Sequence, residues 1–397
     1  MEKKLWLGII AVTFIASSWV VPGTSSAVPS FARQTGKSCA GCHSIWPRLN
    51  SAGREFKLTG YTDVAEDYPR IVKDNMDLLR YGPLSMSIIS LPYSKVSGRR
   101  SETLIPNEVA VFYAGRISPN IGAFMEPVWS KESGVFELEF AKLNAATRWK
   151  NNTVGIVGGK MDVGGADPYN TIRFTAYHTI NQPAIFSQPD ALSGTRDFFS
   201  FVGTTNQGIV LNGKFFQFLY AAVGGFRGHE SNDPGDAFAR LAAEFPIGGE
   251  ANIMIGGFYY GGKEMYELTP PTFYESKFRR CGADFQYQLE SGSNIIDVVG
   301  VYMAGKDKDL DDTPGREVKF YGYYAEASYF YDRMYGITVG YDHISSDQDH
   351  GLDKKGPTFN VTFLPWLNTK LGLEYSIFDL ANGVKERDTN LLVHLYF

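Results

Sequence analysis

The feature that most constrains the fold is a two-residue alternation that begins near Leu84 and runs to the end of the chain. In the segments 335–342, 359–363 and 371–377, large apolar residues alternate with small or polar ones. Such a period places apolar side chains on one face of a β-strand and polar side chains on the other. We therefore predict that this part of the chain is all β.

The spacing of turn signals predicts how these strands connect. Short turns are expected at 118–120, 151–152, 212–213, 248–249, 291–292, 332–333 and 367–368. Longer connections are expected at 95–105, 130–135, 162–206, 224–235, 262–275, 305–316, 344–356 and 379–388. This strict alternation is typical of outer-membrane barrels, whose periplasmic turns are short and whose outer loops are long. We predict a transmembrane barrel of about sixteen antiparallel strands over residues 80–397, with a soluble β-sandwich as the alternative.

The last strand and the charged strand positions support the barrel. Leu391, Val393, Leu395 and Phe397 share one face, which resembles the assembly signal of bacterial outer-membrane barrels. The same phasing turns Cys281 toward lipid. A set of charged residues is predicted to face the lumen: Glu137, Glu139, Arg240, Glu244, Arg280, Asp284, Asp297, Asp342, Lys370 and Glu374. A barrel of this size encloses an aqueous channel, so these residues either line it or contact a polar plug.

The first 27 residues read as a secretory signal peptide. Lys3 and Lys4 precede an apolar run, and Ser25–Ala27 offers a small-residue cleavage site. The alternative is a membrane anchor. No later apolar run approaches the ~20 residues of a spanning helix, and a formal net charge of −5 argues against nucleic acid as a partner.

Residues 28–79 contain the run Cys39-Ala-Gly-Cys42-His43. C-x-x-C-H is the attachment signature of c-type haem, in which two thiols bond to the porphyrin and the adjacent imidazole, here that of His43, binds the iron. A thioredoxin-like pair does not explain His43, and a zinc site lacks a second pair because the only other cysteine is Cys281. We predict one covalent haem c.

The remainder of this segment reads as small and helical, with helices expected over 47–58 and 71–79. A segment of this length is too short for an independent core. We therefore expect it to lie inside the barrel or to plug it.

The region 28–61 reads V-P-S-F-A-R-Q-T-G, then the haem motif, then W-P-R-L and G-R-E-F-K-L-T-G-Y. This resembles the monohaem cytochrome–porin fusions of the outer membrane, whose best-known members oxidise ferrous iron. The departures are Trp46, where Phe is usual, and Ser51-Ala52, where Pro-Phe is usual. The resemblance implies an outer-membrane oxidoreductase. Its donor is Fe(II), and its acceptor is a periplasmic c-type cytochrome or similar carrier.

Further site residues are expectations of the same resemblance and of general haem chemistry. If Ile89, Leu91 and Tyr93 face lipid, Met86 at the start of the first barrel strand faces the lumen. Met86 is therefore the candidate for the second axial ligand, with Met76 as its rival, and His/Met ligation would raise the haem potential. Arg33, Arg54 and Lys57 are candidates for contacts with the haem propionates, or else form an exposed face.

The acidic runs 307–312 and 347–353 are candidate contacts for Fe(II), whose preferred ligands include oxygen atoms, or else are simply solvated. Two other functions remain open. One is a conduit for another extracellular donor or acceptor, and the other is a diffusion porin with a regulatory haem plug.

Overall fold

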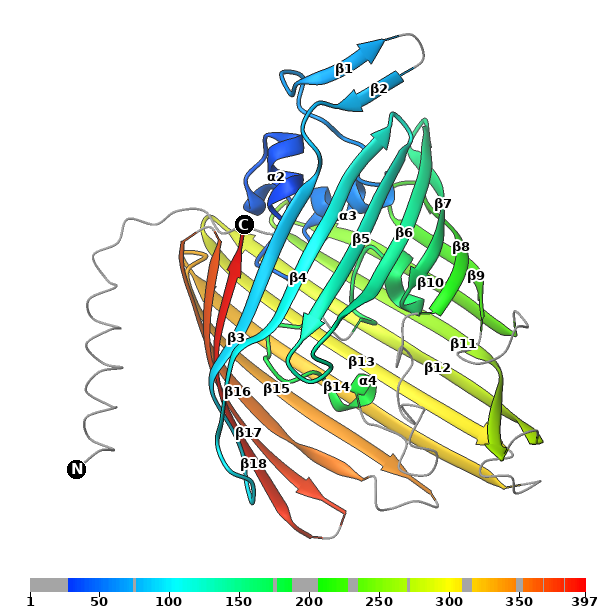
Figure 1. The fold of residues 1–397 in the computed structure, drawn as a ribbon, viewed down its shortest axis with the longest axis vertical. Coiled ribbons are helices and arrows are strands. Elements are labelled where there is room, and N and C mark those ends of the chain that lie inside the picture. Colours follow the sequence, from blue (N-terminus) through cyan, green and yellow to red (C-terminus); the bar gives the residue numbers. More distant parts are fainter. Residues whose placement is uncertain are drawn as a thin grey trace.

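The computed structural model describes residues 28–73, 76–173, 177–187, 206–227, 235–269, 272–308, 316–347, 353–366, 368–381 and 383–397. The predicted signal peptide lies outside these ranges. Sixteen antiparallel strands, β3 to β18, form one closed barrel in chain order (Figure 1). The predicted strand number is confirmed. None of the helices within the described ranges is long and apolar enough to cross a membrane.

The strands are 8 to 20 residues long. Their bounds are β3 Leu84–Val96, β4 Glu102–Ser118, β5 Ile121–Ser130, β6 Phe136–Trp149, β7 Asn152–Met161, β8 Asn206–Phe215, β9 Leu219–Phe226, β10 Asp236–Ile247, β11 Ala251–Thr269, β12 Thr272–Ser291, β13 Asn294–Lys308, β14 Glu317–Tyr331, β15 Tyr335–Ser346, β16 Lys354–Trp366, β17 Thr369–Leu380 and β18 Lys385–Tyr396.

The barrel closes where its last strand pairs with its first. β18 runs antiparallel to β3, and the backbones of Met86 and Phe397 exchange hydrogen bonds of 3.2 and 2.8 Å. Both ends of the barrel therefore lie at one rim. The short turns lie at this same rim, as the sequence predicted.

The two faces of the wall differ as the alternation predicts. Along β14, every second residue is buried, while Tyr321, Tyr323 and Tyr329 face outward and are exposed. Cys281 is likewise exposed on the outward face of β12. Eight of the ten predicted lumen charges are buried and Glu139 lines an internal cavity, whereas Glu137 is exposed. The barrel thus has an apolar outer surface and an interior that combines these charges with buried apolar side chains.

Two predicted connections are wrong. Asn212 and Gly213 lie within β8, and the turn comes at 216–218, where Phe216 and Gln217 have positive φ. Gly213 is required in the strand because a Cβ there would lie 2.9 Å from the Phe215 ring and from a backbone oxygen. The long loop expected at 262–275 is also absent, since β11 continues to Thr269 and β12 begins at Thr272.

Residues 28–61 form a plug inside the short-turn rim (Figure 1). The plug contains helix α2 (Pro29–Thr35), the short 3-10 helix η2 (Cys39–Gly41) and helix α3 (Ser51–Leu58). The helix predicted from Pro47 begins later because the Asn50 side chain caps it, accepting a 3.0 Å bond from Gly53 N. Thr59 and Gly60 end it as predicted, with Gly60 at φ +73°.

The helix predicted over 71–79 is wrong. The chain forms a hairpin there, with strands β1 (Arg70–Lys73) and β2 (Met76–Leu79). Figure 1 shows this hairpin projecting beyond the rim. Asp77 of β2 pairs with Arg116 of β4, which ties the hairpin to the barrel wall.

A buried ion pair anchors the plug to the wall. Arg54 Nη1 lies 2.5 Å from Glu244 Oε1, and both side chains are buried. The backbones also meet closely at Gly60 and Gly122, because a Cβ on Gly122 would lie 1.9 Å from the Gly60 carbonyl oxygen. The plug and the barrel therefore form one packed unit.

A second segment, here called the strap, crosses the lumen beyond the plug. It comprises the described residues 162–173 and 177–187, with 3-10 helix η3 (Val163–Ala166) and helix α4 (Ala184–Ser187). Arg240 of the wall binds Asp167 of the strap at 2.9 Å. Backbone N–H groups of the strap donate to inward carboxylates of the wall, namely Glu326, Asp342 and Glu374. Three of the predicted lumen charges, Arg240, Asp342 and Glu374, thus hold the strap in place together with Glu326, which was not predicted.

Candidate haem site

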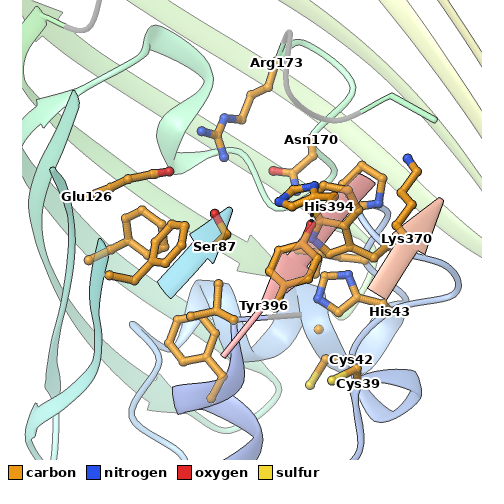
Figure 2. Close-up of a pocket in the computed structure, with 18 of the residues that line it drawn as sticks. Cys39, Cys42, His43, Ser87, Glu126, Asn170, Arg173, Lys370, His394 and Tyr396 are labelled. Atoms are coloured by element: carbon orange, nitrogen blue, oxygen red, sulfur yellow. Dashed lines mark hydrogen bonds between the residues drawn. The ribbon is translucent and has the colours of Figure 1, made fainter. Parts of the chain in front are cut away.

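A cavity of about 480 Å³ lies between the plug, the strap and the wall. Its walls come from α2 and α3, from the start of β3, from β4 to β6 and from the inward faces of β17 and β18 (Figure 2). Its size falls within the range of small-molecule and cofactor sites. Cys39, Cys42 and His43 all line it.

The local backbone brings the three motif residues to one place. The η2 turn is closed by the bond from His43 N to Cys39 O, at 2.8 Å. Asn50 fixes this turn from the other side, since its side chain donates to Ala40 O at 3.2 Å and its N–H donates to Cys42 O at 3.0 Å. Gly53 lets α3 approach, because a Cβ there would lie 2.0 Å from Cys42 O.

The imidazole of His43 is oriented for ligation. Its Nδ1 lies 3.2 Å from Arg48 O, which fixes the ring and leaves Nε2 for an iron atom. Burial lowers the pKa of His43 to about 4, so the ring is neutral and its lone pair is available. Cys39 and Cys42 form no disulfide bond with each other, and burial raises the pKa of the Cys42 thiol.

Aromatic side chains form much of the remaining wall. Phe31 stacks on Tyr61 with ring centroids 4.9 Å apart, and Phe56 meets Phe31 edge-on at 5.1 Å. From the barrel, Phe112, Phe124 and Phe140 continue this surface. Such an aromatic surface suits a porphyrin ring.

The residues present therefore fit haem c. Cys39 and Cys42 could supply the two thioether sulfurs, and His43 could supply one axial nitrogen. Lys57 and Arg173 also line the cavity and are basic side chains that carboxylate groups would meet there. Among the described residues, no group of three or more His, Cys, Asp or Glu side chains could hold a bare metal ion. A porphyrin iron needs only one or two protein ligands.

The structure places the two predicted arginines away from the cavity. Arg33 is exposed and donates to Leu84 O. Arg54 is directed at the wall, where it binds Gln286 at 2.9 Å as well as Glu244 and Gln288. Arg54 therefore anchors the plug, and neither arginine reaches the cavity. Lys57 does, donating at 2.5 and 2.8 Å to Asp167 O and Asn170 Oδ1.

The predicted orientation of Met86 is wrong. Ser87, Ile89 and Leu91 of β3 line the cavity, so Met86, next to Ser87, faces the opposite side. The error has a physical cause, because Ile89 and Leu91 are apolar and were assigned to lipid although they face the cavity. Met76 belongs to the β1–β2 hairpin and is not among the lining residues.

The groups that the wall presents to the cavity were not predicted from the sequence. Leu392, His394 and Tyr396 alternate on the inward face of β18 and line it. Trp46 lies edge-on to His394 with ring centroids 5.1 Å apart. The alternation of β18 could have indicated this position. If Leu391, Val393 and Leu395 face outward, His394 must face the lumen.

The predicted acidic runs receive little support. Asp307 is buried and pairs with Arg280 at 2.5 Å, so it belongs to the wall and is not a loop ligand. Residues 309–312 and 348–352 lie outside the described ranges. Asp347 and Asp353 accept hydrogen bonds from the backbone N–H groups of Lys319 and Ser346.

No protein-family model matches the chain, and no curated protein matches it in sequence. Solved structures match its fold. In-vitro folded OmpT, an outer membrane protein of Vibrio cholerae, superposes with a TM-score of 0.54 at 10% identity, covering 83% of this chain and 99% of that one. An anion-selective porin from Comamonas acidovorans gives 0.55 at 11%, covering 79% and 98%. Salmonella typhi OmpF in complex with daunomycin gives 0.54 at 10%, covering 83% and 100%. The chain therefore has the fold of an outer-membrane porin.

Proposed function

We propose that this chain is an outer-membrane c-type cytochrome that oxidises extracellular Fe(II) and delivers the electrons to a periplasmic carrier, with one covalent haem c as its cofactor. One observation carries the proposal. The two thiols and the imidazole of a haem-attachment motif line a single aromatic cavity inside a porin-like barrel. A bound haem c would supply a one-electron carrier at that position.

The architecture suits a donor that stays outside the cell. The apolar band of an outer-membrane barrel is about 25 Å tall and insulating. Fe(II) is such a donor, because its ferric product precipitates near neutral pH and would foul the periplasm. Each Fe(II) gives up one electron, which the periplasmic carrier accepts. The reaction requires no acid, base or nucleophile from the protein.

Ion pairs between the plug, the strap and the wall hold the site in place. Arg54 and Glu244 hold the plug against the wall, while Arg240 and Asp167 hold the strap across the lumen. Aromatic rings from the plug and the wall line the cavity between them. The short-turn rim, where the plug lies, is the periplasmic rim in this proposal.

The proposal is tested on protein produced in a host with haem-attachment machinery. A haem stain on a denaturing gel should label wild type and Cys281→Ser, whose thiol lies on the outer face, but not the double variant Cys39→Ser/Cys42→Ser. Anaerobic stopped-flow mixing with Fe(II) should then reduce the wild-type haem. An unlabelled wild type, or a haem that Fe(II) does not reduce at any pH at which the protein is folded, would end the proposal.

A second candidate is solute diffusion, which the fold shared with porins favours. The structure weighs against it because the plug and the strap both cross the lumen. Conductance of the purified protein in planar bilayers separates the two functions. A filled lumen should give little or no steady current, whereas a porin-sized current would favour diffusion.

A further inference from the structure

We infer that His394 is the second axial ligand of the haem iron, facing His43 across the cavity. The inference rests on the proposed cofactor. It also replaces the expectation of a methionine ligand.

Few groups on the cavity wall can bind iron. Among the described lining residues there is no methionine, and the only histidines are His43 and His394. The lysines are less suitable, because Lys57 is bonded to the strap and Lys370 donates to His178 O while lying over the Trp46 ring. Lys37 is exposed and lies only two residues before Cys39, on the plug side.

The imidazole of His394 has one nitrogen without a partner. The residue is only 5% exposed, and its Nδ1 lies 3.0 Å from the Tyr396 hydroxyl. Its Nε2 is buried and makes no hydrogen bond. Buried polar atoms nearly always have a partner, so an orphaned nitrogen on a cavity wall indicates a group bound in that cavity.

The two imidazoles come from different parts of the molecule and line the same cavity. His43 projects from the plug, whereas His394 projects from β18 of the barrel wall (Figure 2). A planar group attached to Cys39 and Cys42 would lie between these two surfaces. His43 would then bind one face and His394 the other.

The surroundings fix the orientation of the His394 ring. Trp46 packs edge-on against it, and the Tyr396 ring lies 4.1 Å from it between centroids. If Nδ1–H donates to the Tyr396 oxygen, the lone pair of Nε2 remains for the metal. Hydrogen bonds of this kind set the tautomer of metal-bound histidines. Tyr396 is therefore a positioning residue.

Ligation by two imidazoles has a consequence for the electron donor. Replacing an imidazole by a thioether raises the haem potential, so the bis-imidazole iron has a lower potential than the His/Met iron expected from the sequence. The proposed site therefore requires a stronger reductant than a His/Met haem would.

The experiment uses full-length protein with haem attached. The wild type should give the low-spin ferric electron paramagnetic resonance spectrum of a bis-imidazole haem. His394→Gln should become high-spin and bind carbon monoxide rapidly when reduced, and added imidazole should restore the low-spin spectrum. His394→Met should show a sulfur-to-iron charge-transfer band and a raised midpoint potential. His343→Gln, on the outer face of β15, should match the wild type.

The outcomes separate this inference from the proposed function. A wild type without covalent haem would refute the proposed function. A haem-loaded His394→Gln that stays low-spin with an unchanged potential would overturn only the ligand assignment. If both His394 variants fail to fold, the wild-type spectrum decides, because a signal other than that of two imidazoles refutes the inference.

Discussion

The ion pair between Arg54 and Glu244 should control how often the plug leaves the wall. The two side chains are 1% and 4% exposed, and their charged atoms lie 2.5 Å apart. Removing one partner of a buried pair costs about 3–5 kcal/mol because the other charge remains buried. Glu244→Gln preserves shape and hydrogen-bonding capacity, so we expect about 3 kcal/mol. Since 1.4 kcal/mol corresponds to a factor of ten, plug release should become roughly 100-fold more frequent.

Amide hydrogen exchange followed by mass spectrometry measures this release, because local opening exposes the backbone bonds of α3. Exchange in residues 51–58 should accelerate about 100-fold in Glu244→Gln, while the barrel strands remain protected. Glu386→Gln is the matched control. Its pair with Lys354, at 3.2 Å, is about one-fifth to one-quarter exposed, and such pairs contribute at most about 1 kcal/mol. Wild-type exchange of α3 in Glu244→Gln would refute the reasoning.

Three further predictions concern the plug and the site. Gly122→Val should displace the plug and raise bilayer conductance, because a Cβ there would lie 1.9 Å from Gly60 O. Gly300→Ala is the control and should conduct like the wild type, since no atom lies within 4 Å of its Cβ. Equal currents in both variants would contradict the close packing of the plug against the wall. Asn50→Ala should destabilise α3 by about 1 kcal/mol and lower the yield of attached haem. The yield is measured as haem absorbance per amount of protein. An unchanged yield would show that Asn50 does not shape the haem-attachment motif. Met86→Leu should leave the haem spectrum and potential unchanged, and a shift in either would restore Met86 as a ligand.

Much of the barrel could be predicted because the direction of each side chain follows from its position within its own strand. A strand in a closed barrel must show alternate faces to lipid and lumen, so alternation alone placed Arg240, Asp284 and Cys281 on their correct sides. The turn after β8 could not be read in this way, because Phe216 and Gln217 adopt positive φ without the glycine that usually marks such a turn.

The site was harder to predict because one rule failed there. Apolar residues of a barrel strand normally face lipid, but a cavity for a flat apolar group is also lined by apolar residues. Because Ile89 and Leu91 are apolar, they were assigned to lipid, and Met86 was therefore assigned to the wrong face of β3. The role of Arg54 depended on a partner 190 residues away in the chain, which no local pattern reveals. Cys39, Cys42 and His43 could be recognised from their spacing alone, without knowledge of a distant partner.

If the chain carries the proposed haem, the position of Cys39 and Cys42 on an internal cavity has a consequence for biogenesis. Once β18 has paired with β3, the wall surrounds these sulfurs. Under the proposed function we therefore expect attachment to precede closure of the barrel. The loaded segment would then serve as a template around which the last hairpins close.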